Sequence, residues 1–336
     1  MLDLSALTEL LAQPRRIVIT THHKPDGDAM GSSLGLYNYL IQLGHHAKVI
    51  APSDYPDFLS WMPGNEEVII YTENTQQSEI LIAEAELIFC LDFNALNRIN
   101  EMGELVRQSP AVKVMIDHHL DPEDFDDFRY WDINACATAQ LVYTFIVDAL
   151  NSKHLINKDV ASCLYTGILT DSASFRLPKT TAEVHRIAAD LIEAGAVNWR
   201  IQELVYNSSS ENRLRFLGHC LANKLEVIDE YNTAIISVTK QEMDQYHSVT
   251  GDTEGIVNYA LSISNVRLAA FIVERSDAVK LSLRSKGEFP ANEICKKYFS
   301  GGGHRNAAGG RSELPLNEVV ELFKSILPNY KKLLIQ

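Results

Sequence analysis

Short apolar runs alternate with segments of helical periodicity through the first half of the chain. Residues 16–21 contain consecutive β-branched residues, which predict a short buried strand. In residues 29–43 the apolar side chains recur at helical spacing, and Gly44 ends the pattern. The same alternation predicts further strands at 47–50, 87–91 and 112–116 and helices at 78–85 and 100–107. This βαβ rhythm predicts an α/β fold, a mainly parallel sheet with helices on both faces.

The pattern changes twice further along the chain. From residue 137 it is mostly helical, with predicted helices at 137–150, 158–169, 181–194 and 211–221. After residue 225 strands return at 234–239, 268–274 and 279–284, together with helices at 290–299 and 316–327. We therefore expect a first domain over residues 1–195, a helical linker over 196–222 and a smaller α/β domain over 223–336.

The composition is that of a globular protein. Of 336 residues, 46% are hydrophobic and 22% are charged, which excludes a largely disordered chain. The chain has 30 Lys and Arg against 44 Asp and Glu, so its formal net charge is −14. This acidity argues against a protein that coats long nucleic acid through phosphate contacts alone. A small phosphorylated substrate is still compatible with it if bound metal ions supply local positive charge.

The cysteines and the N-terminal residues bear on the cellular compartment. The five cysteines are scattered, with neither the spacing of a zinc site nor a disulfide pattern. The first residues lack the basic region and apolar core of a signal peptide, and no apolar run is long enough to span a bilayer. We therefore expect a protein of the reducing cytoplasm that does not act at a membrane.

Candidate chemistry is concentrated first between the strand at 16–21 and the following helix. His22, Asp26 and Asp28 offer one imidazole and two carboxylates within seven residues. Ligands of α/β sheets bind beyond the carboxyl ends of the strands, and such a donor set suits Mn²⁺ or Mg²⁺. The alternative is an acidic loop in which Asp28 is the N-cap of the helix.

Three further carboxylates favour the metal hypothesis. Asp92 and Asp117 each come at the end of an apolar strand, and Asp171 ends an apolar helix. A carboxylate at the end of a buried strand is costly unless it is paired or binds a metal. If these side chains converge with the first group, they would hold two ions about 3.5–4 Å apart that share carboxylates and activate a hydroxide against a phosphoryl group.

A glycine-rich segment near the C-terminus is the last candidate site. Residues 301–310 hold five of the seventeen glycines of the chain, and His304 lies among them. Consecutive glycines let backbone N–H groups turn toward an anion. Arg284, at the end of a predicted strand just upstream, is a candidate for the same anion. The alternative is a flexible hairpin or a helix cap.

As an ordered set, these motifs resemble the DHH phosphoesterase superfamily. The resemblance rests on the set His22, Asp26, Asp28, Asp92, Asp117-His118-His119 and Asp171, followed by Gly301-Gly302-Gly303-His304. It covers nearly the whole chain, and within the superfamily the chain is similar to the bacterial nanoRNase and 3′-phosphoadenosine-5′-phosphate phosphatase group, the NrnA-like proteins. It implies a DHH catalytic domain and, across a cleft, a DHH-associated substrate-binding domain.

The resemblance also implies a role for each site residue. Two Mn²⁺ ions, with Mg²⁺ or Co²⁺ as substitutes, would be held by two sets: His22, Asp26, Asp92 and Asp171, and Asp28, Asp92, His118 and Asp171. His119 would lie beside the scissile phosphate as a donor, and Asp117 would orient His118. The second phosphate of the substrate would bind to Arg284, Gly302, Gly303 and His304. One departure is visible, because many relatives have Thr-x-Glu where this chain has Thr138-Ala139-Gln140.

The function that the resemblance implies is metal-dependent hydrolysis of phosphoesters. The expected substrates are short RNA oligonucleotides, cut to mononucleotides, and 3′-phosphoadenosine 5′-phosphate, cut to AMP, with no sequence-specific reading of nucleic acid. The alternatives are a cyclic dinucleotide phosphodiesterase acting on c-di-AMP or pApA, a polyphosphatase, and a non-catalytic nucleotide sensor. All ligand positions are present, which disfavours the sensor. A homodimer is compatible with this interpretation.

Overall fold

The computed structural model describes residues 4–335. The chain divides into two compact units, residues 1–208 and 209–336. This division falls inside the stretch expected as a linker, although that stretch is not one element, because it contains a helix of each unit. The exact domain limits expected from the sequence stay a prediction.

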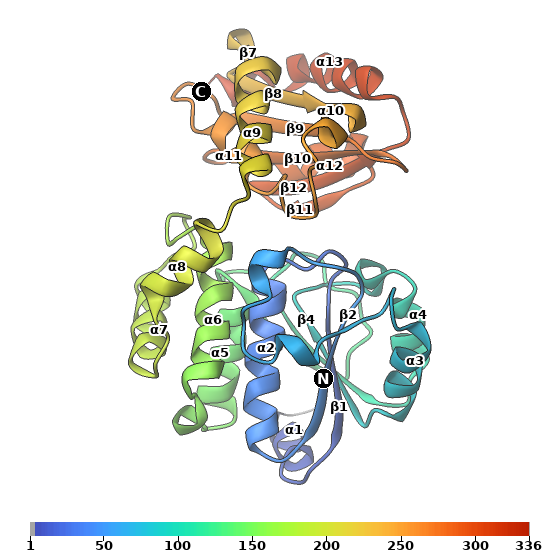
Figure 1. The fold of residues 1–336 in the computed structure, drawn as a ribbon, viewed down its shortest axis with the longest axis vertical. Coiled ribbons are helices and arrows are strands. Elements are labelled where there is room, and N and C mark those ends of the chain that lie inside the picture. Colours follow the sequence, from blue (N-terminus) through green and yellow to red (C-terminus); the bar gives the residue numbers. More distant parts are fainter. Residues whose placement is uncertain (1–3, 336) are drawn as a thin grey trace. The chain divides into compact units, whose positions relative to one another are not determined.

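A parallel sheet of six strands forms the centre of the first unit (Figure 1). The strand order is β3-β2-β1-β4-β5-β6, and every neighbouring pair is parallel. The strands are β1 (Arg16–Thr21), β2 (His46–Ala51), β3 (Ile69–Ile70), β4 (Leu87–Leu91), β5 (Val112–Asp117) and β6 (Phe128–Trp131). The predicted α/β fold is therefore confirmed. The order reverses between β1 and β4, which is where ligands bind in open sheets of this type.

Helices cover both faces of this sheet. One face carries α1 (Leu4–Leu10), α2 (Gly27–Gln42), α5 (Thr138–Thr144) and α6 (Lys158–Asp171). Helices α7 (Ala182–Glu193) and α8 (Asn198–Tyr206) pack on α6, and the apolar residues of all six helices share one core. The other face carries α3 (Thr75–Glu84) and α4 (Met102–Gln108) over a smaller core. The predicted helix at 137–150 ends as α at Thr144 and continues as a π-helical turn over 145–149. Helix α8 lies in the stretch expected as a helical linker, but its bounds were not predicted.

Glycines allow α2 and α6 to pack with their backbones in close contact. A Cβ atom at Gly31 of α2 would lie 2.6 Å from the carbonyl oxygen of Cys163 in α6. A Cβ atom at Gly167 of α6 would lie 2.9 Å from Oδ1 of Asp28 in α2. Real Cβ atoms do not come this close to backbone or carboxylate oxygens, so both positions require glycine. The close approach sets Asp28 directly against α6.

The second unit is a mixed sheet with helices on both faces. Its strand order is β11-β12-β10-β9-β8-β7, antiparallel except for the parallel pair β8 and β9. The strands are β7 (Leu225–Ile228), β8 (Thr233–Val238), β9 (Leu268–Glu274), β10 (Val279–Ser285), β11 (Gly302–His304) and β12 (Ala307–Ser312). The helices α12 (Ala291–Tyr298) and α13 (Leu316–Leu334) cover one face, and α9 (Glu211–His219), α10 (Lys240–Gln245) and α11 (Ile256–Leu261) cover the other. Helix α13 continues through Pro328, beyond its predicted end at 327.

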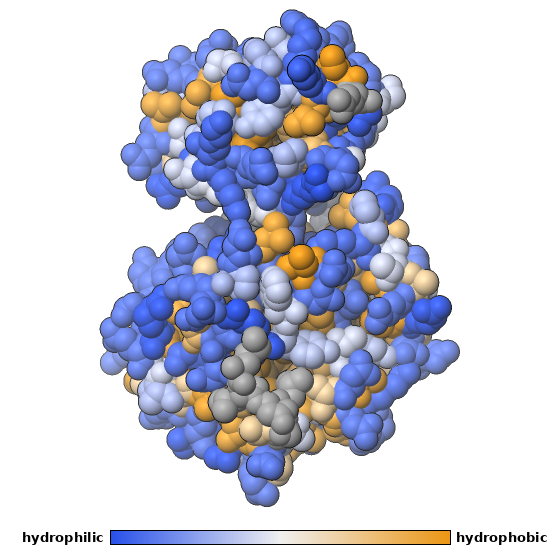
Figure 2. Space-filling model, turned by 180° about the vertical axis from the view of Figure 1, so that it is seen from behind, coloured by the Kyte–Doolittle hydropathy of each residue, from blue (hydrophilic) through white to orange (hydrophobic). Residues whose placement is uncertain are grey.

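One face of the molecule shows how polar and apolar residues are distributed on the surface. On the face drawn in Figure 2, hydrophilic residues predominate over each unit and hydrophobic residues form small groups. Among residues 4–335, no helix combines the length and the apolar character that crossing a membrane requires.

Candidate metal centre

The loop between β1 and α2 separates the roles of its two aspartates. Asp26 is the N-cap of α2, and its Oδ1 accepts hydrogen bonds from the backbone N–H groups of Asp28 (3.0 Å) and Ala29 (3.1 Å). The alternative expectation that Asp28 is the cap is therefore wrong. Asp28 lies in the first turn of the helix, and its carboxylate accepts the backbone N–H groups of Thr138 (2.6 Å) and Ala139 (2.8 Å) at the start of α5.

Asp92 follows β4 in an unusual backbone conformation. Its φ is 64°, in the left-handed region that few residues other than glycine, asparagine and aspartate adopt. The residue is 2% exposed, and its Oδ1 accepts the hydroxyl of Thr138 at 2.8 Å. Its Oδ2 lies 3.5 Å from Nε2 of His22. The sharp bend at the strand end thus places this carboxylate between the β1 loop and α5.

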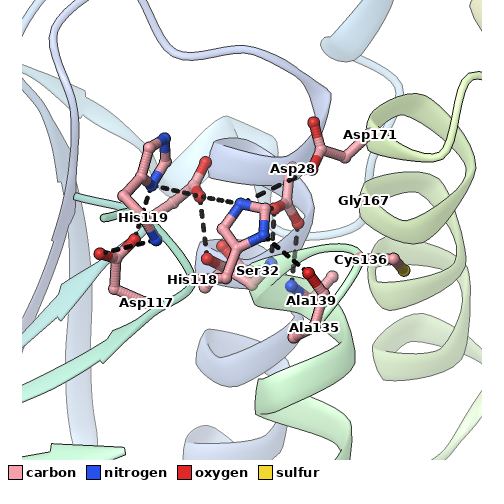
Figure 3. Close-up of polar contacts among 12 residues, drawn as sticks. Asp28, Ser32, Asp117, His118, His119, Ala135, Cys136, Ala139, Gly167 and Asp171 are labelled. Carbon is pink, nitrogen blue, oxygen red and sulfur yellow. Dashed lines mark hydrogen bonds and ion pairs between the residues drawn. The ribbon is translucent and has the colours of Figure 1, made fainter. Parts of the chain in front are cut away.

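His118 lies at the centre of the carboxylates (Figure 3). Its Nε2 lies 3.8 Å from Asp28, 3.5 Å from Asp92 and 3.6 Å from Asp171. Its other ring nitrogen, Nδ1, lies 3.2 Å from the carbonyl oxygen of Ala135. A carbonyl only accepts hydrogen bonds, so this contact holds the proton on Nδ1 and leaves Nε2 to face the carboxylates. The structure therefore brings together the side chains that the sequence singled out at three separate element ends.

Among the groups of donor atoms that could hold a cation, two share Asp92 and include the carboxylates of α2 and its preceding loop. The first group is His22, Asp26 and Asp92, and the second is Asp28, Asp92 and His118, with all donor atoms of a group within 4.8 Å of one another. Two ligands of one ion, each about 2.1 Å from it, lie roughly 3–4 Å apart, so the contacts of His118 fit a shared cation better than direct hydrogen bonds. Carboxylate oxygens with imidazole nitrogens are a set that suits Mg²⁺ or Mn²⁺. The residues present therefore fit a divalent metal centre.

The electrostatics of the site show an excess of buried negative charge. Burial raises the pKa of Asp28 well above its usual value, and the charges of Asp92 and Asp171 raise it further. Burial also raises the pKa of Asp171, to about 6. For His118 burial opposes the charged imidazolium, but Asp92, Asp171 and Asp28 outweigh it and raise its pKa to about 10. Such a cluster strongly favours a bound cation.

Asp117 makes a different contact from the one expected. It was expected to orient His118, but its Oδ1 lies 2.7 Å from Nδ1 of His119 and its Oδ2 accepts the backbone N–H of His119 at 3.1 Å. His118 is instead oriented by Ala135. The two imidazole rings stand edge to face, 79° apart, so they present different directions. Consecutive side chains point to opposite sides as the chain leaves its strand, which separates the two histidines.

The sequence did not indicate the supporting role of three further residues. Thr138 binds both Asp28 and Asp92 from the start of α5. Gln140, noted only as a departure from relatives, accepts the backbone N–H of Cys136 at 2.8 Å and so fixes the turn before α5. Trp131, the last residue of β6, donates its indole N–H to the carbonyl oxygen of His119 at 2.8 Å. The contacts of Thr138 join segments far apart in the chain, so no local pattern indicated them.

The candidate anion-binding residues of the second unit lie on β10 and β11, the two strands that flank β12. The glycine-rich segment forms the β11–β12 hairpin and not a helix cap, and anion binding by it stays a prediction. Ala307 of β12 pairs with His304 on one side and with Arg284 of β10 on the other. Gly303 has a φ of 128°, a backbone conformation that other residues cannot adopt without strain. Arg284 and His304 therefore flank the same position of the sheet.

The family of the chain follows from this fold and site together with sequence comparison. The model of the DHH family N-terminal domain matches residues 16–168, and that of the DHHA1 domain matches residues 232–329. The chain belongs to the DHH family. The two matches fall on the two units that the structure separates, and the first contains the metal centre except for Asp171.

Individual relatives are consistent with this assignment. The chain is 32% identical over 295 residues to the bifunctional oligoribonuclease and PAP phosphatase NrnA of Thermus thermophilus, a match that spans 87% of this chain and 83% of the relative. It is 25% identical to the cyclic-di-AMP phosphodiesterase GdpP of Geobacillus thermodenitrificans, over 97% of this chain but 49% of that protein. Among solved structures, an exopolyphosphatase-related protein from Bacteroides fragilis shares 41% identity, with a TM-score of 0.94 over 99% of this chain and 97% of that chain.

Proposed function

We propose that this protein is a metal-dependent phosphoesterase that hydrolyses short oligoribonucleotides to mononucleotides and 3′-phosphoadenosine 5′-phosphate to AMP. The observation that carries the proposal is the position of His118, whose Nε2 is surrounded by three carboxylates at 3.5–3.8 Å in a buried site at the carboxyl end of the sheet. Sites of this composition hold cations that catalyse phosphoryl transfer.

In this proposal, the chain supplies two sets of metal ligands. His22, Asp26, Asp92 and Asp171 form one set, and Asp28, Asp92, His118 and Asp171 form the other, for two Mn²⁺ ions or for Mg²⁺ or Co²⁺ in their place. When bound, such ions supply an activated water and neutralise negative charge on the phosphoryl group. Thr138 supports both sets through its bonds to Asp28 and Asp92.

The remaining site residues bind and orient the substrate. His119 is held by Asp117 through its ring and its backbone, so its Nε2 is directed away from Asp117, and we propose that it donates to a phosphoryl oxygen of the substrate. Arg284, Gly302, Gly303 and His304 are proposed to bind a second phosphate of the substrate. In the reaction the oxygen of water bonds to phosphorus, the ester oxygen leaves, and that oxygen takes up a proton as an alcohol.

The choice of oligoribonuclease and PAP phosphatase activity over the other activities of the family is supported by how much of each relative this chain matches and by the identity of its ligand residues. The Thermus thermophilus relative named for oligoribonuclease and PAP phosphatase activity is matched over 83% of its length, whereas the cyclic-di-AMP phosphodiesterase is matched over 49%. Every expected ligand position holds a ligating residue in this chain, which disfavours a non-catalytic sensor. Homodimer formation stays a prediction, which light scattering of the purified protein checks.

One assay tests the proposal. The purified protein with Mn²⁺ is offered a dinucleotide, a 24-mer RNA, 3′-phosphoadenosine 5′-phosphate, cyclic di-AMP and polyphosphate, with the Asp92→Asn variant as the inactive control. We expect fast release of mononucleotide from the dinucleotide and of phosphate from 3′-phosphoadenosine 5′-phosphate. Preference for cyclic di-AMP or polyphosphate, or full activity after exhaustive chelation, would refute it.

A further inference from the structure

Trp131 lies beside the proposed catalytic histidine although it belongs to the edge of the sheet. It is the last residue of β6, the outermost strand, and its backbone pairs with Asp117 of β5. Its indole Nε1–H donates to the main-chain carbonyl oxygen of His119 at 2.8 Å. Neighbouring strands are about 4.8 Å apart, so the indole is one strand away from the Asp117–His119 pair.

The indole is anchored and yet exposed. Trp131 is 38% exposed, so much of its ring surface meets solvent, while its one polar atom is already bonded to the His119 carbonyl. Tryptophan side chains bury large apolar areas when they serve only to stabilise a core. A bond to the main chain fixes the orientation of this ring and leaves an apolar face available at the carboxyl edge of the sheet.

A fixed, exposed aromatic ring beside a phosphate-binding residue suits a nucleotide substrate. Nucleobases stack on tryptophan without a requirement for a particular base, because every base has a π-face. The chain has a formal net charge of −14, so stacking on the base would supply affinity that the overall charge does not.

We propose that Trp131 is a substrate-specificity residue that stacks on the nucleobase of the nucleotide whose phosphate lies at His119. This inference rests on the proposed function and extends it, because it assigns a residue that recognises the base. It restricts efficient turnover to phosphoesters that carry a base, and it leaves the identity of that base open.

Kinetics on matched substrates test the proposal. Trp131→Leu keeps apolar bulk but removes the aromatic face, and Trp131→Phe keeps an aromatic face but removes the bond to the His119 carbonyl. With 3′-phosphoadenosine 5′-phosphate we expect Trp131→Leu to raise KM roughly 5- to 150-fold, the usual range for loss of one stacked base. Trp131→Phe is expected to restore most of the affinity. With the abasic analogue, ribose 3,5-bisphosphate, KM stays close to that of the unmodified protein in both variants.

Fluorescence gives a readout that does not depend on turnover. AMP, which carries a base, is expected to quench the tryptophan emission of the unmodified protein, and ribose 5-phosphate is not. The quenching should be lost in Trp131→Phe and kept in Trp199→Leu, a matched control because Trp199 is likewise exposed, at 62%, and lies on α8.

Two results would overturn the assignment. If Trp131→Leu and Trp131→Phe lower kcat equally on the base-bearing and abasic substrates, the indole only positions His119. If AMP quenches Trp131→Phe as strongly as the unmodified protein, the base does not contact Trp131. Failure of the unmodified protein to hydrolyse either 3′-phosphoadenosine 5′-phosphate or a dinucleotide would refute the proposed function instead, and the AMP titration would still decide whether Trp131 binds a base.

Discussion

Asp117 holds His119 by two atoms at once. One carboxylate oxygen lies 2.7 Å from the ring Nδ1 and the other accepts the backbone N–H at 3.1 Å. Because a carboxylate only accepts hydrogen bonds, Nδ1 carries a proton and the ring can neither rotate nor change its tautomer without losing this bond. The pair therefore resembles a positioned acid–base group more than a metal ligand, in contrast to the neighbouring His118.

This contrast predicts different results for the two histidines. His119→Ala should keep its metal and lower kcat by about 10²–10⁴, the usual contribution of a positioned acid or base. His118→Ala should lose metal, because its Nε2 faces three carboxylates. Metal content by elemental analysis, measured beside kcat, checks both. Equal metal loss in the two variants would contradict the division of roles.

Metal affinity should rise with pH. The raised pKa of His118, about 10 without metal, means that the imidazole carries an extra proton at neutral pH and must release it before Nε2 binds a cation. Affinity should therefore increase about tenfold per pH unit between about pH 6 and 8, for one proton released. Below about pH 6 the slope should steepen, because Asp171, with a pKa of about 6, then takes up a proton as well. Competition with a chelator of known affinity measures this, and an affinity that is flat with pH would contradict it.

Side chains introduced at the glycines between α2 and α6 should destabilise the protein. Gly31→Ala and Gly167→Ala each force a methyl group to within 3 Å of an oxygen, so each should lower the free energy of unfolding by about 1–3 kcal/mol. Gly218→Ala in α9 is the control, because a Cβ there meets nothing within 4 Å. In that helix the substitution should leave the free energy of unfolding unchanged or raise it by up to about 1 kcal/mol. Denaturant unfolding measures all three, and equal effects would contradict the packing argument.

Arg284 should act on binding and not on metal content. Arg284→Ala should weaken binding of a dinucleotide or of 3′-phosphoadenosine 5′-phosphate about ten- to a hundredfold, as expected for loss of about 1.5–3 kcal/mol from a charge-assisted contact. Bis-p-nitrophenyl phosphate, which has no second phosphate, should be little affected. Arg311→Ala is the control, since Arg311 lies on β12 of the same sheet and pairs with Asp277. If the binding of both kinds of substrate weakens equally, Arg284 has a structural role and does not bind the second phosphate.

Patterns along the chain predicted the elements better than the directions of their side chains. Alternating apolar runs located β1 and β4, and the carboxylates just beyond them pointed to the site, because the ends of parallel strands meet at one edge. The alternative in which Asp28 is the cap of α2 was wrong, and residue type could not exclude it, since Asp26 and Asp28 are equally good caps by type. What decides between them is the pair of N–H groups at Thr138 and Ala139, more than a hundred residues away, which hold Asp28.

The partner of Asp117 was missed for the same physical reason. Sequence adjacency made His118 and His119 equivalent candidates, and the choice depends on where the carbonyl of Ala135 lies. For the glycine-rich segment a hairpin was among the alternatives, but the pairing of β12 with β10 was not predicted, because β10 comes from upstream of helix α12. In each case a contact of high sequence separation fixed the geometry.

The left-handed backbone at Asp92 limits how this site can change over evolution. Besides aspartate, the conformation is readily accepted by asparagine and glycine, both of which are one nucleotide change away from an aspartate codon. Neither supplies an anionic ligand, so each such change would inactivate the centre and leave the fold intact. Descendants of this chain that lost hydrolysis by this route would keep the scaffold and the second unit, and would be free to evolve into nucleotide-binding proteins.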